Sequence, residues 1–266
     1  MSDCTHNCST CDSKCSTIEY LSLHEGSHIK NIIGVVSGKG GVGKSLVTSL
    51  LASKMKKEGY RVGILDADIT GPSIPKAFGY NERAEGDGDG ILPGITKEGI
   101  EIISLNMFVD NPKNPVVYRG PALVGVLSQF YKDVKWGDLD YLFIDMPPGT
   151  ADINLTIFQQ IPLSGLIIVT TPQDLVNLIV AKSMKMAEML NVPVYGLVEN
   201  MSYLKCPDCG KKIYLFGESH IDEVVADYHV PLLAQIPIDP KLTEMVDNGK
   251  VYEYDNNYFD YLFDIL

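Results

Sequence analysis

The sequence predicts an α/β fold, with a mainly parallel β-sheet, helices on both of its faces and a single domain. Apolar, β-rich runs recur along the chain from residue 32 onward, and helical patterns separate most of them. These runs are almost continuously apolar, which is typical of strands buried on both faces of a parallel sheet. A chain of 266 residues with 45% hydrophobic residues is also long enough to bury one large core.

The apolar patterns place the elements along the chain. Strands are expected at Ile32–Val36, Val62–Leu65, Ile100–Leu105, Tyr141–Ile144, Leu166–Val169, Val194–Val198 and Leu232–Ile236. Helices are expected near residues 44–58, 122–134, 175–190 and 217–228. Residues 70–99, rich in Gly, Pro and Asp, are expected to form a long surface loop with room for a short hairpin. The acidic, aromatic stretch Tyr252–Leu266 is expected to pack on the body of the domain.

The first 28 residues differ in composition from the rest of the chain. They are rich in Ser, Thr, Cys and His and too poor in apolar residues for a core, so we expect a tail at residues 1–28 and a domain at residues 29–266. Four of the six cysteines lie in this tail, at Cys4, Cys8, Cys11 and Cys15. Their spacing would allow an iron–sulfur cluster or a Zn(Cys)₄ site, and incidental thiols are the alternative.

A glycine-rich segment follows the first expected strand. Within it, Gly38, Gly43, Lys44 and Ser45 match the phosphate-loop pattern G-x-x-x-x-G-K-[ST], which predicts a P-loop NTPase. Glycines let backbone N–H groups approach a polyphosphate, and the positive end of the next helix faces the same anion. Lys44 is expected to neutralise the β- and γ-phosphate oxygens of ATP, and the Ser45 hydroxyl to bind Mg²⁺. The remaining loop residues are expected to line the same site; they are Lys39, Gly40, Gly41 and Val42.

Acidic residues follow two of the later strands. The second strand ends in Asp66 and Asp68, and the fourth runs into Asp145. The carboxyl ends of parallel strands face the crevice in which such sheets bind ligands. One carboxylate there can hold a Mg²⁺-bound water and another can orient the attacking water; an apolar strand that ends in Asp145 has the Walker B arrangement. The Pro-Pro-Gly turn after this strand could place the N–H of Gly149 near a γ-phosphate.

The other two cysteines form a separate motif. Cys206 and Cys209 lie three apart in the sequence Cys-Pro-Asp-Cys-Gly. They can ligate one metal, but two thiolates do not close a tetrahedral site, so the tail cysteines or a second copy of the chain would supply the others. A redox dithiol is the competing interpretation, although the motif does not open a helix after a first strand as thioredoxin-like motifs do.

Charge and composition argue against two classes of partner. A net charge of −12 repels nucleic acid phosphates and anionic lipid, and no local basic patch is visible. No apolar run approaches the ~20 residues of a membrane span. We therefore expect neither nucleic acid nor a membrane as a partner. Because a phosphate loop needs a nucleotide-rich, reducing compartment, we expect a cytoplasmic protein whose cysteines serve metal or redox chemistry.

The segment Lys39–Ser45 (KGGVGKS) resembles the deviant Walker A motif of a superfamily of dimeric ATPases that includes septum-positioning, plasmid-partitioning and nitrogenase iron proteins. Within that superfamily the chain resembles the Mrp/ApbC-type iron–sulfur cluster carriers. The segments that match are Asp66–Pro75 (DADITGPSIP), Tyr118–Pro121 (YRGP), Gln129–Tyr141, Asp145–Asp152 (DMPPGTAD), Val198–Ser202 (VENMS) and the Cys-x-x-Cys motif. Together they span roughly residues 30–240.

The resemblance implies an ATP-hydrolysing homodimer. It would bind a labile [4Fe–4S] cluster between its subunits through Cys206 and Cys209 and pass the cluster to apo iron–sulfur proteins. Three alternatives stand beside it. A positioning or partitioning switch is disfavoured by the net charge of −12, and an electron-transferring reductase would need bridging cysteines within residues 16–205, which contain none. The third is an ATPase with a zinc-bridged structural dimer.

The same resemblance implies roles for individual residues. Lys39 would reach across the dimer to the partner's nucleotide, and Asn200 would contact adenine. Asp68 would lie near the attacking water, with Asp145 as the acid of the second switch region. The tail departs from the family pattern, because eukaryotic cytosolic relatives space their four N-terminal cysteines more widely than this chain does. A second cluster in the tail is therefore an expectation from the four cysteines themselves and not from the family resemblance.

Overall fold

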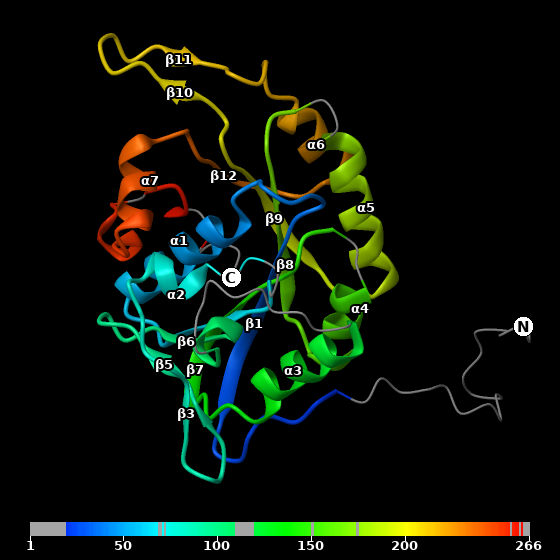
Figure 1. The fold of residues 1–266 in the computed structure, drawn as a ribbon. Coiled ribbons are helices and arrows are strands. Elements are labelled where there is room, and N and C mark those ends of the chain that lie inside the picture. Colours follow the sequence, from blue (N-terminus) through cyan, green and yellow to red (C-terminus); the bar gives the residue numbers. More distant parts are fainter. Residues whose placement is uncertain are drawn as a thin grey trace, which may run out of the picture.

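The structure is a computed structural model that describes residues 20–68, 71, 73–109, 120–149, 152–173, 176–255, 257–260 and 262. An eight-stranded sheet forms its centre, with the strand order β12-β9-β8-β1-β7-β2-β6-β5 (Figure 1). Neighbouring strands are parallel except at the edge, where β5 runs antiparallel to β6. The predicted mainly parallel sheet is confirmed.

Each of the seven predicted strands is present in the sheet. They are β1 (His28–Val36), β2 (Val62–Asp66), β6 (Glu101–Ser104), β7 (Asp138–Asp145), β8 (Gly165–Thr170), β9 (Val194–Glu199) and β12 (Leu232–Gln235), with β5 (Gly94–Ile95) added at the edge. The first strand begins earlier than the apolar run does, because its polar residues from His28 onward pair with the start of β7. An apolar pattern cannot reveal such a polar extension.

Helices cover both faces of the sheet (Figure 1). One face carries α1 (Lys44–Lys57), α2 (Ile74–Ala77) and α7 (Pro240–Asp247), and the other carries α3 (Gly120–Lys132), α4 (Asp152–Gln160), α5 (Val176–Met189) and α6 (Ile221–Tyr228). No helix among the described residues is long and apolar enough to cross a lipid bilayer.

The four predicted helices are present as α1, α3, α5 and α6, but the prediction was incomplete. The sequence did not predict α2, α4 or α7, whose short amphipathic patterns lie next to prolines. The last of these does carry a start signal, because Pro240 follows Asp239, whose side chain accepts a hydrogen bond from the backbone N–H of Lys241 at 2.8 Å. The helix expected from residue 217 begins instead at Ile221, where the Ser219 hydroxyl accepts from the Ile221 N–H at 3.1 Å.

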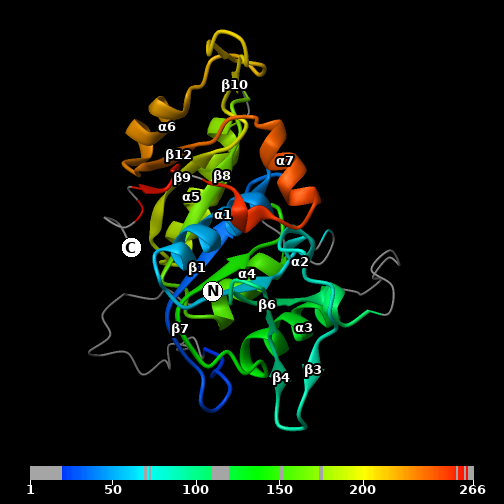
Figure 2. The same cartoon turned by 90° about the vertical axis from the view of Figure 1, so that its left-hand side faces the viewer.

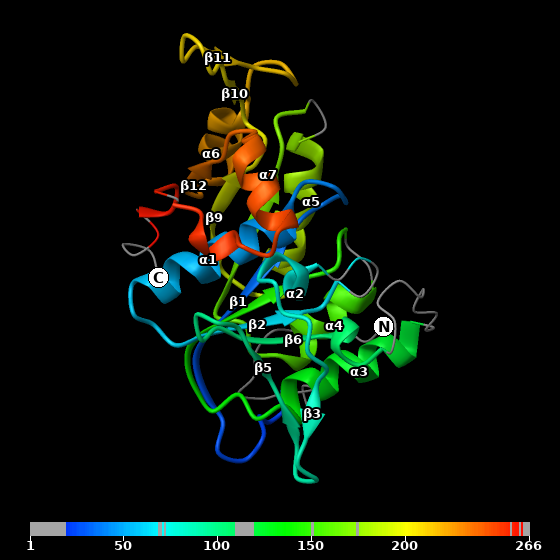
Figure 3. The same cartoon turned by 60° about the vertical axis from the view of Figure 1, so that its left-hand side comes forward.

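The stretch at residues 70–99 is more than a loop. It contains α2, the edge strand β5 and an exposed hairpin of β3 (Glu85–Gly86) and β4 (Ile91–Leu92). A second small hairpin, of β10 (Leu204–Lys205) and β11 (Lys212–Ile213), carries the Cys-x-x-Cys motif. The two hairpins project at opposite ends of the molecule (Figures 2 and 3).

Both ends of the described chain pack on the core. Leu21 and Leu23, from the segment expected to be a tail, pack against it, and the Leu21 N–H donates to the Gln160 carbonyl at 2.8 Å. At the other end, Phe259 and Leu262 are fully buried. The expectation that the C-terminal stretch packs on the body is therefore confirmed for its described residues.

The strand order decides where a ligand can bind. The strand that leads into the glycine-rich loop, β1, lies between β7 and β8, so the loop follows a strand whose neighbours end in Asp145 and Thr170. Next to β7, β2 ends in Asp66, which pairs with Asp145 in the parallel register. The carboxyl ends of these strands therefore bring two acids to the edge of the sheet where the loop turns.

Candidate functional site

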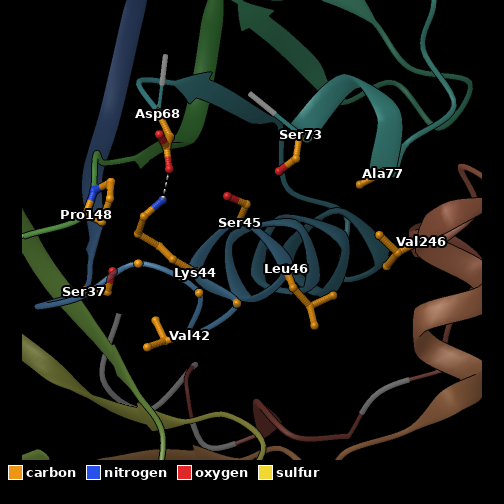
Figure 4. Close-up of a pocket in the computed structure, with 13 residues that line it drawn as sticks. Ser37, Val42, Lys44, Ser45, Leu46, Asp68, Ser73, Ala77, Pro148 and Val246 are labelled. Carbon is orange, nitrogen blue, oxygen red and sulfur yellow. Dashed lines mark ion pairs between the residues drawn. The ribbon is translucent and has the colours of Figure 1, made fainter. Parts of the chain in front are cut away.

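The glycine-rich loop between β1 and α1 forms a cradle for an anion. Gly41 and Gly43 adopt positive φ values of +80° and +79°, a backbone conformation that residues other than glycine rarely adopt. At Gly43 a Cβ atom would also lie only 2.2 Å from the Asn200 Nδ2. The cavity in front of the loop has a volume of ≈ 290 Å³ and is lined by residues of the loop together with Asp68, Ser73, Ala77, Pro148 and Val246 (Figure 4).

Lys44 and Ser45 meet the carboxylate of Asp145 at the start of α1. The Lys44 Nζ lies 2.6 Å from Oδ1 of Asp145, and the Ser45 hydroxyl donates to Oδ2 at 2.5 Å. The hydroxyl of Thr48, one turn after Lys44 on the same helix, donates to Oδ1 at 3.1 Å. Thr48 was not predicted, although its i, i+4 spacing from Lys44 places both on one helix face.

Burial dominates the electrostatics of Asp145. Its side chain is fully buried, and this raises the pKa of the carboxyl although Lys44 and the Ser45 hydrogen bond lower it. A cation placed beside the Ser45 and Asp145 oxygens would offset that burial, and hydroxyl and carboxylate oxygens are ligands that Mg²⁺ prefers. The residues at this position therefore fit a magnesium ion.

The two acids after β2 differ in environment. Asp66 is buried, and its oxygens accept hydrogen bonds from the Ser104 hydroxyl at 3.0 Å and from the Asp68 N–H at 3.2 Å. Its burial, reinforced by the charge of Asp145, raises the pKa of Asp66 to about 8. Asp68 lines the cavity instead, and its Oδ2 lies 3.7 Å from the Lys44 Nζ (Figure 4). Only Asp68 is therefore placed to act on a molecule in the cavity.

The Pro-Pro-Gly turn after β7 is held from two sides. The Gly149 N–H donates to the Ser37 carbonyl at 2.8 Å, which ties the turn to the beginning of the phosphate loop. The amide Nδ2 of Asn154, on α4, donates to the Pro147 carbonyl at 3.0 Å and to the Gly149 carbonyl at 2.5 Å. The Gly149 N–H would have to leave Ser37 to reach a γ-phosphate. Asn154, like Ser104, was not predicted, since only the fold brings it to the site.

Asn200 and Lys39 lie at the edges of the phosphate loop. Asn200 is buried, and its Nδ2 donates to the Val42 carbonyl at 2.9 Å. Lys39 extends along the surface, and its ammonium donates to the side-chain oxygen of Gln173 after β8. Lys39 is thus partnered within its own chain in this structure.

The Cys-x-x-Cys motif lies on the turn of the β10–β11 hairpin, away from the phosphate loop (Figure 1). Cys206 is half-buried, Cys209 is exposed, and both are free thiols. Hydrogen bonds from the backbone N–H groups of Cys209 and Asp208 lower the pKa of the Cys206 thiol, which favours the thiolate that metals bind. Within the described ranges, no third Cys, His, Asp or Glu completes a metal-binding group.

The tail cysteines fall outside the described residues. Cys4, Cys8, Cys11 and Cys15 belong to residues 1–19, so their relation to Cys206 and Cys209 stays an expectation.

Comparison with known proteins places the chain in a family. Residues 28–263 match the family model described as ParA, NUBPL iron-transfer P-loop NTPase. A protein of Clostridium perfringens named iron-sulfur cluster carrier protein is 50% identical over 235 residues, which cover 85% of this chain and 82% of that protein. A protein of the same name from Methanocaldococcus jannaschii is 45% identical over 260 residues, covering 94% of this chain and 90% of the relative.

Solved structures agree with this placement. A nucleotide-binding protein from Archaeoglobus fulgidus, determined in complex with ADP, superposes with a TM-score of 0.79 at 42% identity and covers 88% of this chain and 92% of its own. The cell-division protein MinD of Aquifex aeolicus has the same fold, with a TM-score of 0.59 at 18% identity over 86% of this chain and 91% of its own. The glycine-rich loop, the acids at the sheet edge and these similarities together show that the chain belongs to the ParA family of NUBPL-type iron-transfer P-loop NTPases.

Proposed function

We propose that this chain is an ATP-hydrolysing carrier of iron–sulfur clusters. A homodimer would hold a labile [4Fe–4S] cluster as cargo between its subunits and pass it to apo iron–sulfur proteins in the cytoplasm. The observation that carries the proposal is the pair of free thiols on a projecting hairpin of a P-loop NTPase, with the pKa of Cys206 lowered. The relatives named iron-sulfur cluster carrier proteins support it.

The number of ligands supports a dimer. Cys206 and Cys209 supply two thiolates, and a cubane cluster takes four. A two-fold axis beside the hairpin would bring the same pair from a second copy. Because Cys209 and the hairpin turn are exposed, the two pairs can approach each other without rearrangement of the sheet.

ATP hydrolysis would use the residues of the cavity. Lys44 would neutralise phosphate charge, Lys39 of the partner copy would add a second positive charge, and Asp68 would orient the attacking water. Ser45 and Asp145 would hold Mg²⁺, which supplies further charge neutralisation at the phosphates. Phosphate oxygens would compete with Asp145 for Lys44, now 2.6 Å from that carboxylate. Nucleotide binding is thereby linked to the position of β7 and of the turn that follows it.

Anaerobic reconstitution tests the proposal. The parent is the full chain with Cys4, Cys8, Cys11 and Cys15 changed to Ser, which leaves Cys206 and Cys209 as the only thiols of the six. We expect this parent to bind iron and sulfide in equal amounts and to become dimeric by light scattering. In the same background, Cys206→Ala should lose the iron and sulfide but keep its affinity for ATP.

The control is Asp208→Asn, which alters the same turn without removing a thiol. Zinc in the parent as purified anaerobically, with no iron taken up on reconstitution, would favour the zinc-bridged structural dimer. Iron and sulfide that persist unchanged in Cys206→Ala would contradict the assignment of the thiols.

A further inference from the structure

The segment that carries the cysteines leaves the sheet and returns to it beside one buried carboxylate, that of Glu199. Glu199 is the last residue of β9 and is 1% exposed. Its Oε2 accepts hydrogen bonds from the Ser202 hydroxyl at 2.5 Å and from the Gln235 Nε2 at 3.0 Å. Its Oε1 accepts from the Ser219 hydroxyl at 2.5 Å. Three donors thus converge on one acceptor group.

Two of these donors flank residues 203–218, which we call the cysteine ribbon. Ser202 immediately precedes the ribbon and Ser219 immediately follows it, while Gln235 is the last residue of the neighbouring strand β12. The Ser219 hydroxyl also accepts from the Ile221 N–H at the start of α6. The Glu199 carboxylate therefore joins both ends of the ribbon to the edge of the sheet.

The two ends of the ribbon are held differently. At the outgoing end, backbone groups contribute, because the Ile238 N–H donates to the Tyr203 carbonyl at 2.7 Å and Leu204 forms a β-bridge with Ile238. Residues 207–218 are exposed. The bond from Ser219 to Glu199 ties down the returning end, so its loss should loosen the ribbon where it rejoins the fold.

Glu199 is also adjacent in the chain to a residue that contacts the phosphate loop. The following residue, Asn200, donates through its side chain to the Val42 carbonyl in the phosphate loop at 2.9 Å. The backbone N–H of Asn200 donates to the Thr170 carbonyl at the end of β8, at 2.8 Å. A shift of the phosphate loop would therefore act on Asn200 and, through the next peptide unit, on the group that fastens the ribbon.

We propose that Glu199 is a positioning residue for the thiol pair. It fixes the cysteine ribbon relative to the phosphate loop, so that nucleotide binding changes the accessibility of Cys206 and Cys209. A carboxyl group suits this role because its two oxygens can accept from all three donors at once. The inference rests on the proposed function only in taking these thiols as the cargo ligands.

The rate of thiol modification tests this inference. In the full chain with the four tail cysteines changed to Ser, Ellman's reagent reports on Cys206 and Cys209 alone. The measured quantity is the ratio of modification rates with and without a non-hydrolysable ATP analogue and Mg²⁺. In the parent we expect the nucleotide to change the modification rate by about fivefold. This value is at the lower end of the coupling that is typical between two sites in a protein.

Glu199→Gln should bring this ratio close to one while the affinity for the analogue stays within about twofold, since the binding residues themselves are untouched. Ser219→Ala removes a single donor and should act in the same direction, which keeps the test valid if Glu199→Gln folds poorly. The matched control is Glu223→Gln, an exposed carboxylate on α6 that contacts His220 and should leave the ratio as in the parent.

A merely structural role would lower thermal stability without changing the ratio. The inference is overturned if Glu199→Gln and Ser219→Ala have the same ratio as the parent, whatever its value, including one. Failure of the proposed function would look different, because the parent would then take up no iron or sulfide on reconstitution while the difference in thiol ratio between parent and variants remained.

Discussion

At the scale of single residues, the carboxylate of Asp145 organises the nucleotide site. It accepts hydrogen bonds from Lys44, Ser45 and Thr48, all in the first two turns of α1. This arrangement holds the loop in place from the strand β7, and it means that any phosphate group must compete with a buried carboxylate for the same lysine. The loop is therefore shaped before it meets its ligand.

Two glycines of the loop give a matched pair for testing that shape. Both have positive φ, but a Cβ at Gly41 meets nothing within 4 Å, whereas one at Gly43 would lie 2.2 Å from the Asn200 Nδ2. We expect Gly41→Ala to cost about 1 kcal/mol of stability from backbone strain alone. Gly43→Ala should cost about 1–3 kcal/mol and weaken ATP binding at least about tenfold.

Urea unfolding and calorimetric titration with ATP measure these effects. Adding Asn200→Ala to Gly43→Ala should recover part of the stability by removing the atom that the new methyl group meets. Equal losses for the two glycine variants would show that the contact with Asn200 has no effect.

Asp66 predicts a dependence of stability on pH. Burial raises its pKa from 3.8 to about 8, so between these values the folded chain keeps a proton that the unfolded chain has released. Stability contributed by this group is present at low pH and falls as pH rises through that window. Asp66→Asn removes the titrating carboxyl group. We therefore expect this variant to lose less stability than the parent between about pH 5 and pH 8.

Urea unfolding at the two pH values measures this difference. Asp222→Asn, an exposed carboxyl on α6, is the control and should follow the parent. A loss of stability with pH that is as large in Asp66→Asn as in the parent would contradict the raised pKa.

At the scale of elements, helix α4 and the turn before it act together. The Asn154 amide holds two carbonyls of the turn, and its own Oδ1 is buried with no hydrogen-bond partner among the described residues. We expect Asn154→Ala to lower the kcat of ATP hydrolysis about tenfold with little change in KM, because it would misplace a turn that is proposed to contact the phosphates rather than the nucleotide base.

Steady-state kinetics separates the two constants. Gln159→Ala on the exposed face of the same helix controls for loss of helix stability. A change confined to KM would indicate that the turn binds the nucleotide in the ground state instead.

The sequence predicted elements well where the pattern is local. All seven long strands were placed because their apolar runs are continuous, and the phosphate loop because its spacing is encoded in consecutive residues. Short helices such as α4 and α7 were missed, since fewer than three turns give a weak periodicity. The Glu199 contacts could not be predicted from the sequence either, because Ser219 and Gln235 lie far from Glu199 in the chain and only the fold brings them together.

At the scale of the whole molecule, the C-terminal segment closes over α1 (Figure 3). Phe259 is fully buried, and the Lys57 ammonium donates to the Tyr254 carbonyl at 3.0 Å. We expect Phe259→Ala to lower the free energy of unfolding by about 3–5 kcal/mol through the cavity it leaves. Phe216→Ala, at a side chain that is 43% exposed on the cysteine ribbon, should change it by less than about 0.5 kcal/mol.

Chemical denaturation compares the two phenylalanine variants directly. Similar stabilities for both would mean that the C-terminal segment does not contribute to the cooperative core.

The arrangement around Glu199 has a consequence for how such proteins can diversify. Because Ser202 and Ser219 both reach the same carboxylate, the ribbon starts and finishes at nearly the same point on the fold. It is in effect an insertion, whose length and residues could change without displacing any strand of the eight-stranded sheet. Evolution or protein engineering could thus replace the ribbon and its two thiols while the phosphate loop and its cavity stay as they are.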